Sequence, residues 1–430
     1  MHFLTEFLTG TQFYLFILGV FTVLFWVIPQ KRQWISFLVT VLLFAYFAHW
    51  LVPDPTDDLQ LYFWFLDRIR QGGQSTFEWV VRNDNFGWNT YFFCKYYYRF
   101  FTLLPNESYD HFLSSVTVFL TYGMAMLTLH RASKRFEVDK FHTYFGTLFF
   151  LATYWFYDSA SGIRSSIAIG IVFACAYHQF VEKKNYTLCF LGYFIAAFFH
   201  PGGVIALAVV FITFLTFNTD GKFFYFLLLF SAAIGSYVVN YLSSVTDIGF
   251  IQALDERVDK YSQRAGDDSS TTFYVAIATL LLVAALILYV TNYLKEDERF
   301  PQFSKFYKYS ANTIFFLFGI IMISVVFSRF VRWIVPQIGA IFFMVGMQLQ
   351  KNQMMAKGVS DTLYNSPPLE RLKYKARPVV LALFIIFTLV YIWYACNGTS
   401  LIWAHFEHEW TEAGYPYQWE GWYETGEVIS

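Results

Sequence analysis

The residues in this chain with the clearest capacity for chemistry are an arginine and a histidine at the ends of neighbouring apolar runs. Arg164 begins the run 164–181, and His200 ends the run 186–200. At about 1.5 Å rise per residue, two such helices joined by a short turn cross a bilayer core of about 30 Å and return. We therefore expect Arg164 and His200 on the same membrane face, where ionisable side chains commonly mark a functional site.

Two further arginines, Arg329 and Arg332, are three residues apart, so a helix places them on one face. Together with Arg164 they could form a cationic cluster. Guanidinium groups bind phosphate with two hydrogen bonds at once and stay charged when they are partly buried. The alternative is that these side chains extend to the membrane interface and only anchor their helices.

His200 and an acidic segment supply candidate proton acceptors. Histidine exchanges a proton near neutral pH, although a histidine at a helix end can equally be a packing residue. Asp57 and Asp58 follow the apolar run 34–52, and Arg68 and Arg70 come soon after them. These carboxylates could act as a general base, bind sugar hydroxyls or pair with the arginines; helix capping is the structural alternative.

The composition is that of a membrane protein. Hydrophobic residues make up 57% of the 430 residues and charged residues 14%, against about 25% charged in a soluble domain. The net charge of −1 gives no reason to expect a nucleic acid as partner. The segment His405–Glu409 lacks the spacing of a metalloprotease helix, and no nucleotide-binding loop is present, so we expect neither a metal nor a cofactor.

The apolar runs predict an all-α, polytopic transmembrane bundle of about twelve spans. Most basic residues fall in alternate loops, which places the N-terminus outside the cytoplasm by the positive-inside rule. The expected spans are 12–29, 34–52, 111–130, 141–157, 164–181, 186–200, 202–218, 222–244, 272–294, 310–328, 329–349 and 378–397.

Three segments are expected outside the membrane on the extracytoplasmic side: the loops 52–110 and 244–271 and the tail 397–430. The first contains an aromatic stretch with Lys95 and Arg99, which favours a short interfacial helix over a span. With no low-complexity linker, residues 1–430 are expected to form one membrane-embedded domain.

Several of these motifs resemble, in order, those of the EpsG family of Wzy-type polysaccharide polymerases. The resemblance rests on an acidic segment before an aromatic helix and on the motifs GIRSSIAIGIVF, FFHPGGVIAL, FSRFVRW and YPYQWEGWY. The family pattern more often has Arg-Gln-Gly where this chain has Arg164-Ser165-Ser166.

The resemblance implies a GT-C-like membrane glycosyltransferase in the bacterial cytoplasmic membrane, with its active site on the extracytoplasmic face. Such enzymes join oligosaccharide repeat units carried on undecaprenyl pyrophosphate into O-antigen, capsule or exopolysaccharide. Donor and acceptor lipids, the bilayer, a chain-length regulator and a flippase are the partners to expect.

This chemistry assigns roles to the candidate residues. The arginines would bind the departing pyrophosphate, without a metal, and one displacement would invert the anomeric centre. His200 is the first candidate for the base, and Asp57 or Asp58 the second. The residues expected to contact the glycan are Tyr62, Arg68, Tyr157, Asp158 and Tyr417.

Two other functions stay open at this point. A transporter or flippase for lipid-linked oligosaccharide would favour interrupted helices in two related halves and charges near the midplane. A membrane acyltransferase that modifies polysaccharide could also use a histidine and arginines. The charges here gather at one expected face, which favours the polymerase over transport.

Overall fold

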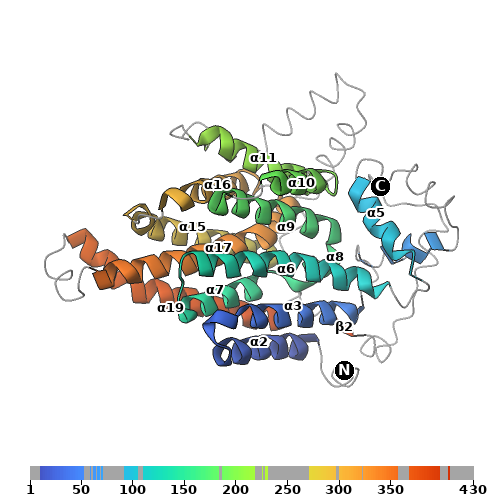
Figure 1. Ribbon diagram of the computed structural model, residues 1–430, viewed down its shortest axis with the longest axis horizontal. Helices are drawn as coiled ribbons and strands as arrows, with labels where there is room; N and C mark the ends of the chain where they lie inside the picture. Colours follow the sequence, from blue (N-terminus) through green and yellow to red (C-terminus); the bar gives the residue numbers. More distant parts are fainter. Residues whose placement is uncertain are drawn as a thin grey trace. The chain divides into compact units, whose positions relative to one another are not determined.

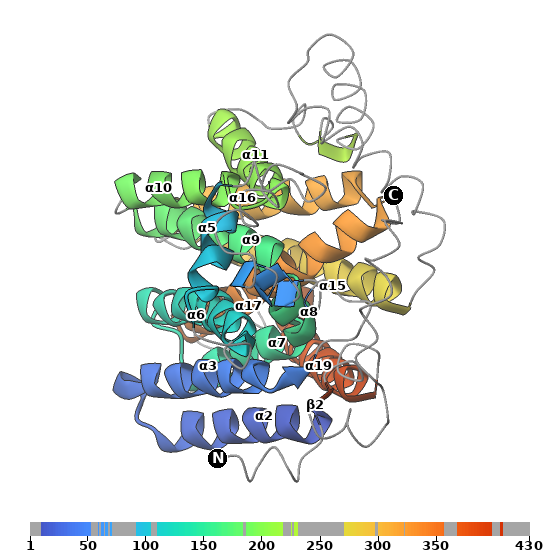
Figure 2. The ribbon, with the colours of Figure 1, turned by 90° about the vertical axis from the view of Figure 1, so that its right-hand side faces the viewer.

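The protein is described from a computed structural model (Figures 1 and 2). The structure describes residues 10–52, 59, 62–63, 65–67, 69–70, 92–104, 110–183, 186–217, 225, 228–230, 271–296, 300–321, 323–356, 368–397 and 405–406. These residues are almost entirely helical, which confirms the all-α prediction. The exception is a two-residue antiparallel pairing of β1 (Leu51–Val52) with β2 (His405–Phe406).

The described chain forms two compact units, each built from segments that are far apart in sequence. The first contains residues 1–123, 155–167 and 392–430, and the second contains residues 124–154 and 168–391. Whether the whole chain acts as the single domain expected from sequence stays a prediction.

The first unit contains a helical hairpin. Helices α2 (Gly10–Val27) and α3 (Trp34–His49) are joined by a short 3-10 turn, η1 (Gln30–Arg32), and lie side by side in both views. Their interface is aromatic, with Phe13 against Phe47 at one end and Phe25 against Phe37 at the other. Edge and tilted ring pairs of this kind are favourable packing arrangements.

The remaining helices of the first unit position its polar residues. They are α5 (Phe92–Phe101), the first half of α6 (His111–Arg135), the short α8 (Phe156–Ser161), and the start of α9 (Ile163–Tyr177). The expected helix in the aromatic stretch is therefore present as α5. Its buried face consists of Cys94, Tyr98 and Phe101.

Helix α17 (Ser324–Ala356) forms the centre of the second unit. It packs against α7 (Lys140–Thr153) and α15 (Thr271–Glu296), and Figure 1 shows it among them. Every residue from 333 to 350 of this helix is buried. Close approach depends on glycine: a Cβ on Gly339 would lie 2.7 Å from atoms of both Phe149 and Val283.

A second helical layer of this unit continues from α9 through a π-helical turn, η3 (His178–Glu182). It comprises α10 (Tyr186–Ala197), α11 (Pro201–Thr216) and α16 (Phe300–Gly319). Lys308 of α16 donates a hydrogen bond to the Thr216 carbonyl and another, 3.1 Å long, to the Phe217 carbonyl. A cation at the negative end of α11 satisfies carbonyls that the helix itself leaves open.

Among the residues that the structure describes, five helices are long and apolar enough to cross a membrane: His111–Arg135, Ile163–Glu182, Phe273–Thr291, Val326–Met355 and Ala376–Cys396. Shorter apolar helices span Thr11–Val27, Trp34–His49, Tyr186–Ala197 and Pro201–Thr216. The chain is therefore a multi-pass membrane protein. The expected span 222–244 lies mostly outside the described residues.

Three expected boundaries were wrong. The run 141–157 breaks after Thr153, where Tyr154 and Trp155 have extended backbone, so that α7 and α8 are separate. The expected division between the runs 310–328 and 329–349 is also misplaced, because α16 runs from Phe300 to Gly319 and α17 begins at Ser324. The start of α16 was not predicted because its first half contains charged lysines. The division between α16 and α17 was misplaced because the sequence there is an unbroken apolar run.

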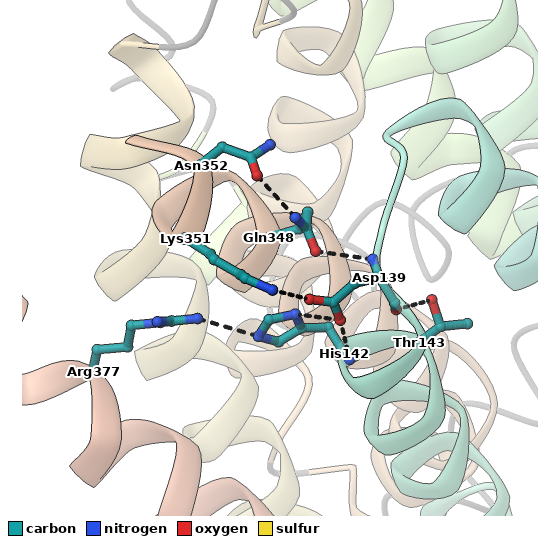
Figure 3. Close-up of polar contacts among 7 residues, drawn as sticks. All are labelled: Asp139, His142, Thr143, Gln348, Lys351, Asn352 and Arg377. Atoms are coloured by element: carbon teal, nitrogen blue, oxygen red, sulfur yellow. Dashed lines mark hydrogen bonds and ion pairs between the residues drawn. The ribbon is translucent and has the colours of Figure 1, made fainter. Parts of the chain in front are cut away.

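A polar network ties α7, α17 and α19 (Pro368–Asn397) together within the second unit (Figure 3). Asp139 caps α7 by accepting the His142 backbone N–H at 2.9 Å, and its other oxygen accepts from Lys351 at 2.7 Å. The His142 ring bridges Asp139 at 2.9 Å to Arg377 at 3.4 Å. The ring therefore donates from Nδ1 to the carboxylate and accepts at Nε2 from the guanidinium.

The electrostatics of Asp139 make this network sensitive to acid. Burial raises the pKa of the carboxyl, but hydrogen bonds from His142 and Lys351 outweigh it, and the pKa falls well below its usual range. A depressed pKa stabilises the fold at pH values above the unfolded value, and this stabilisation is lost as the pH falls through the folded value.

Asp139→Asn should therefore lower the melting temperature at neutral pH by several degrees, because it removes the charge that Lys351 and His142 bind. Thermal unfolding in detergent measures this, with Glu137→Gln as a control for an exposed carboxylate two residues away. The gap between wild type and Asp139→Asn should narrow as the pH falls below about 4, because the unfolded state then binds a proton at Asp139 that the native carboxylate does not yet bind. A gap that is independent of pH would contradict the role of the charge.

A glycine provides the second prediction. A Cβ on Gly203 of α11 would lie 2.3 Å from the Ala196 carbonyl oxygen, a backbone atom that cannot move aside cheaply. Gly203→Ala should separate α10 from α11 and markedly lower folded yield and melting temperature. Gly19→Ala is the matched control, since nothing lies within 4 Å of its Cβ position; there the added methyl group should be neutral or stabilising.

Candidate functional site

Arg164 lies in the first turn of a helix, immediately after a break at Gly162. The Gly162 N–H ends α8 by donating to the Asp158 carbonyl at 2.8 Å, and the Gly162 carbonyl begins α9 by accepting from Ser166 at 3.0 Å. The Ser166 hydroxyl also reaches back across the break to the Ser159 carbonyl at 3.3 Å. These local bonds place the arginine at the N-terminal, positive end of α9.

The Arg164 guanidinium is held by Tyr62. Its Nε–H donates to the Tyr62 hydroxyl at 3.0 Å, and its central carbon lies 5.5 Å from the centroid of the same ring. Tyr62 is only 2% exposed, and its ring centroid lies 5.0 Å from that of Tyr98 in α5. Tyr98 is itself fully buried. The Tyr62 ring is therefore buried, and the glycan contact expected from sequence stays a prediction.

The residues beneath the guanidinium are neutral at physiological pH. Burial raises the pKa of the Cys94 thiol to about 12, although Arg164 opposes this rise. Burial also raises the pKa of Tyr98, and Tyr62 and Cys94 add to the effect. Arg164 is thus the charged residue in a group whose other members, Tyr62, Tyr98 and Cys94, are buried.

A buried ion pair joins Arg70 to Asp110 near the end of α5. Arg70 binds both carboxylate oxygens of Asp110, one at 2.9 Å, and it donates to the carbonyls of Phe101 and Leu104 at the end of α5. The two side chains are 12% and 5% exposed. Burial raises the pKa of Asp110, and the hydrogen bonds from Arg70 oppose that rise. Arg70 is therefore bonded both to Asp110 and to the backbone at the end of α5.

His200 lies at the start of a helix and not at the end of one. Helix α10 ends at Ala197, and His200 is the N-cap of α11, with its Nδ1 accepting the Gly202 N–H at 3.0 Å. A neutral ring that accepts at Nδ1 carries its proton on Nε2. In this arrangement His200 offers a hydrogen-bond donor toward its surroundings.

Arg329 and Arg332 are three residues apart in α17, as expected, and both are partly buried. Arg329 does not open a span, however, because α17 already begins at Ser324. A ligand shared between this pair and Arg164 stays a prediction.

Comparison with known protein families gives one match. The EpsG family model matches residues 34–356, well over half of the chain. The chain belongs to the EpsG family. The family is linked to exopolysaccharide synthesis. Searches of curated proteins and of solved structures gave no match.

The match to the EpsG family covers most of the residues discussed here, including Tyr62, Arg164 and His200. Tyr157 and Asp158, expected to contact the glycan, both lie in α8 and are partly exposed. Asp57, Asp58, Arg68 and Tyr417 lie outside the described residues. Their roles stay predictions.

Sequence reasoning missed Cys94, Tyr98 and the pair Arg70–Asp110. The sequence could have indicated the first two, because Cys94, Tyr98 and Phe101 are spaced so that they lie on one face of a helix. The ion pair joins residues 40 positions apart, and nothing in the local sequence connects them.

Substitution of His200 can separate its structural role from a chemical one. His200→Asn keeps an acceptor at the N-cap and should leave the melting temperature of this EpsG-family protein nearly unchanged, whereas His200→Ala should lower it. Thermal unfolding of the two variants side by side provides the measurement. Equal melting temperatures for Asn and Ala would show that the capping bond contributes nothing.

Proposed function

We propose that this EpsG-family protein is a polysaccharide polymerase. It transfers a growing chain from undecaprenyl pyrophosphate to the non-reducing end of the next lipid-linked repeat unit, on the extracytoplasmic face of the bacterial cytoplasmic membrane. The proposal includes a GT-C-like bundle of about twelve spans, and a flippase and a chain-length regulator as partners. The product is exopolysaccharide, capsule or O-antigen.

The observation that carries the proposal is the position of Arg164. A cation in the first turn of a helix opposes the helix dipole, which favours anions at that end by about 0.3–1 kcal/mol. The arrangement becomes favourable when an anion binds, since the guanidinium and the backbone N–H groups at the start of α9 then attract the same ligand. A pyrophosphate matches both.

The chemistry needs charge stabilisation more than it needs an acid. When the glycosidic bond to pyrophosphate breaks, the bonding electron pair stays with the phosphate oxygen, and negative charge grows there. A fixed guanidinium strengthens its interaction as that charge develops, which lowers the barrier. Arg329 and Arg332 are the proposed additional contacts to the pyrophosphate.

The acceptor hydroxyl must lose a proton as it attacks the anomeric carbon. His200 can take that proton at Nδ1 only if it releases the Gly202 N–H, so its role as base requires a local rearrangement of the α11 cap. Asp57 or Asp58 is the second candidate, and a carboxylate is already ionised at neutral pH. One displacement of this kind inverts the anomeric centre.

The proposal is tested with purified protein in nanodiscs and lipid-linked repeat units, by resolving products as a ladder of lengths. Arg164→Ala should reduce the rate by about 10²–10³-fold, the usual cost of removing a group that stabilises developing charge. Arg99→Ala is the control, because that guanidinium bonds Thr102 within its own turn of chain.

Three results would contradict the proposal. One is the absence of a ladder from the wild-type protein, and another is normal chain length from Arg164→Ala. The third is movement of intact lipid-linked units across the membrane with no change in their length, which would identify a transporter.

A further inference from the structure

We propose that Tyr62 is the positioning residue for Arg164, holding the guanidinium in the orientation that receives the pyrophosphate without neutralising its charge. This inference rests on the proposed function, because the orientation matters only if Arg164 binds the leaving group. It assigns Tyr62 a role different from the sugar contact expected from sequence.

The geometry fixes two properties of the guanidinium at once. The 3.0 Å bond from Nε–H to the Tyr62 hydroxyl sets the direction in which the group points. The position of the central carbon, 5.5 Å from the ring centroid, adds a cation–π attraction to the same side chain. One neutral residue therefore constrains a flexible arginine that otherwise loses much conformational entropy on ordering.

Tyr62 itself is held from two sides. The Tyr98 ring packs against its ring, with the two ring centroids 5.0 Å apart, and both side chains are buried. Arg70, which follows Tyr62 in the sequence, bonds Asp110 and the Phe101 carbonyl at the end of α5. The constraint on Arg164 thus passes through Tyr62 to Tyr98 of α5.

The identity of the residue matters for the chemistry. A carboxylate at position 62 would hold Nε–H more strongly, but it would cancel the positive charge that a pyrophosphate needs. A phenylalanine would keep the ring and lose the hydrogen bond. A buried tyrosine keeps a neutral hydroxyl acceptor beside the cation, so that it orients the guanidinium and preserves its charge.

The test is a double-mutant cycle between Tyr62→Phe and Arg164→Lys, read as the initial rate of polymerisation and as the affinity for farnesyl diphosphate. Lysine keeps the charge but has no Nε–H in that geometry. Tyr62→Phe should slow the wild-type reaction about tenfold, the effect of one hydrogen bond to a charged group. In the Arg164→Lys background the same change should cost less than about twofold.

Tyr97→Phe is the matched control. It removes a tyrosine hydroxyl from α5, the helix that carries Tyr98, and this hydroxyl bonds Thr117 and not Arg164. It should leave rate and affinity unchanged. Equal losses from Tyr62→Phe in both arginine backgrounds would show that Tyr62 acts independently of Arg164, and no loss in the wild type would show that it does not act. Either result overturns the inference.

A spectroscopic measurement separates this inference from the proposed function. In protein labelled with ¹⁵N-arginine, the Arg164 Nε–H resonance, assigned by its disappearance in Arg164→Lys, should shift in Tyr62→Phe and stay in place in Tyr97→Phe. If the protein makes no polymer, the proposed function fails while this shift still establishes the contact. If polymer forms and the resonance does not move, the positioning role fails alone.

Discussion

The hydrogen bond from Arg164 to Tyr62 is the interaction on which the candidate site depends. A guanidinium that is partly removed from water is costly unless protein groups replace its hydration. The Tyr62 hydroxyl and ring provide that replacement without adding an opposing charge. Tyr98 packs against the Tyr62 ring and so helps to keep Tyr62 in place.

The protein handles its buried charges in two distinct ways. Arg70 is neutralised by Asp110 and bonded to two carbonyls, and Asp139 is bound by Lys351 and His142. Breaking such a group by removing one member leaves an uncompensated charge, so these clusters contribute mainly to structure. Arg164 in addition bonds a neutral hydroxyl, that of Tyr62, which orients the guanidinium without adding a negative charge.

Much of the fold could be predicted from sequence, because long apolar runs at membrane length specify helices with little competition. Helices α2, α3, α6 and α9 lie close to their expected positions. The errors occurred where apolarity is a poor guide. Because Lys305 and Lys308 are charged, the first half of α16 was not expected to be helical, although carbonyls at the end of α11 stabilise Lys308 there. Arg329 was expected to begin a helix, but α17 begins at Ser324.

The site could be predicted only as a set of residue types. Arg164 was recognised by its charge at the edge of an apolar run, but its partner Tyr62 lies 102 residues away, and no local pattern reports such a contact. The same limit explains His200, where the sequence FFHPGG indicates a helix end but not which helix the ring serves. Pro201 can occupy the first turn of a helix because its missing N–H is not needed there, so His200 caps the helix that follows. The chemical consequence is that the Nδ1 lone pair is already engaged, and only the three-dimensional structure shows this.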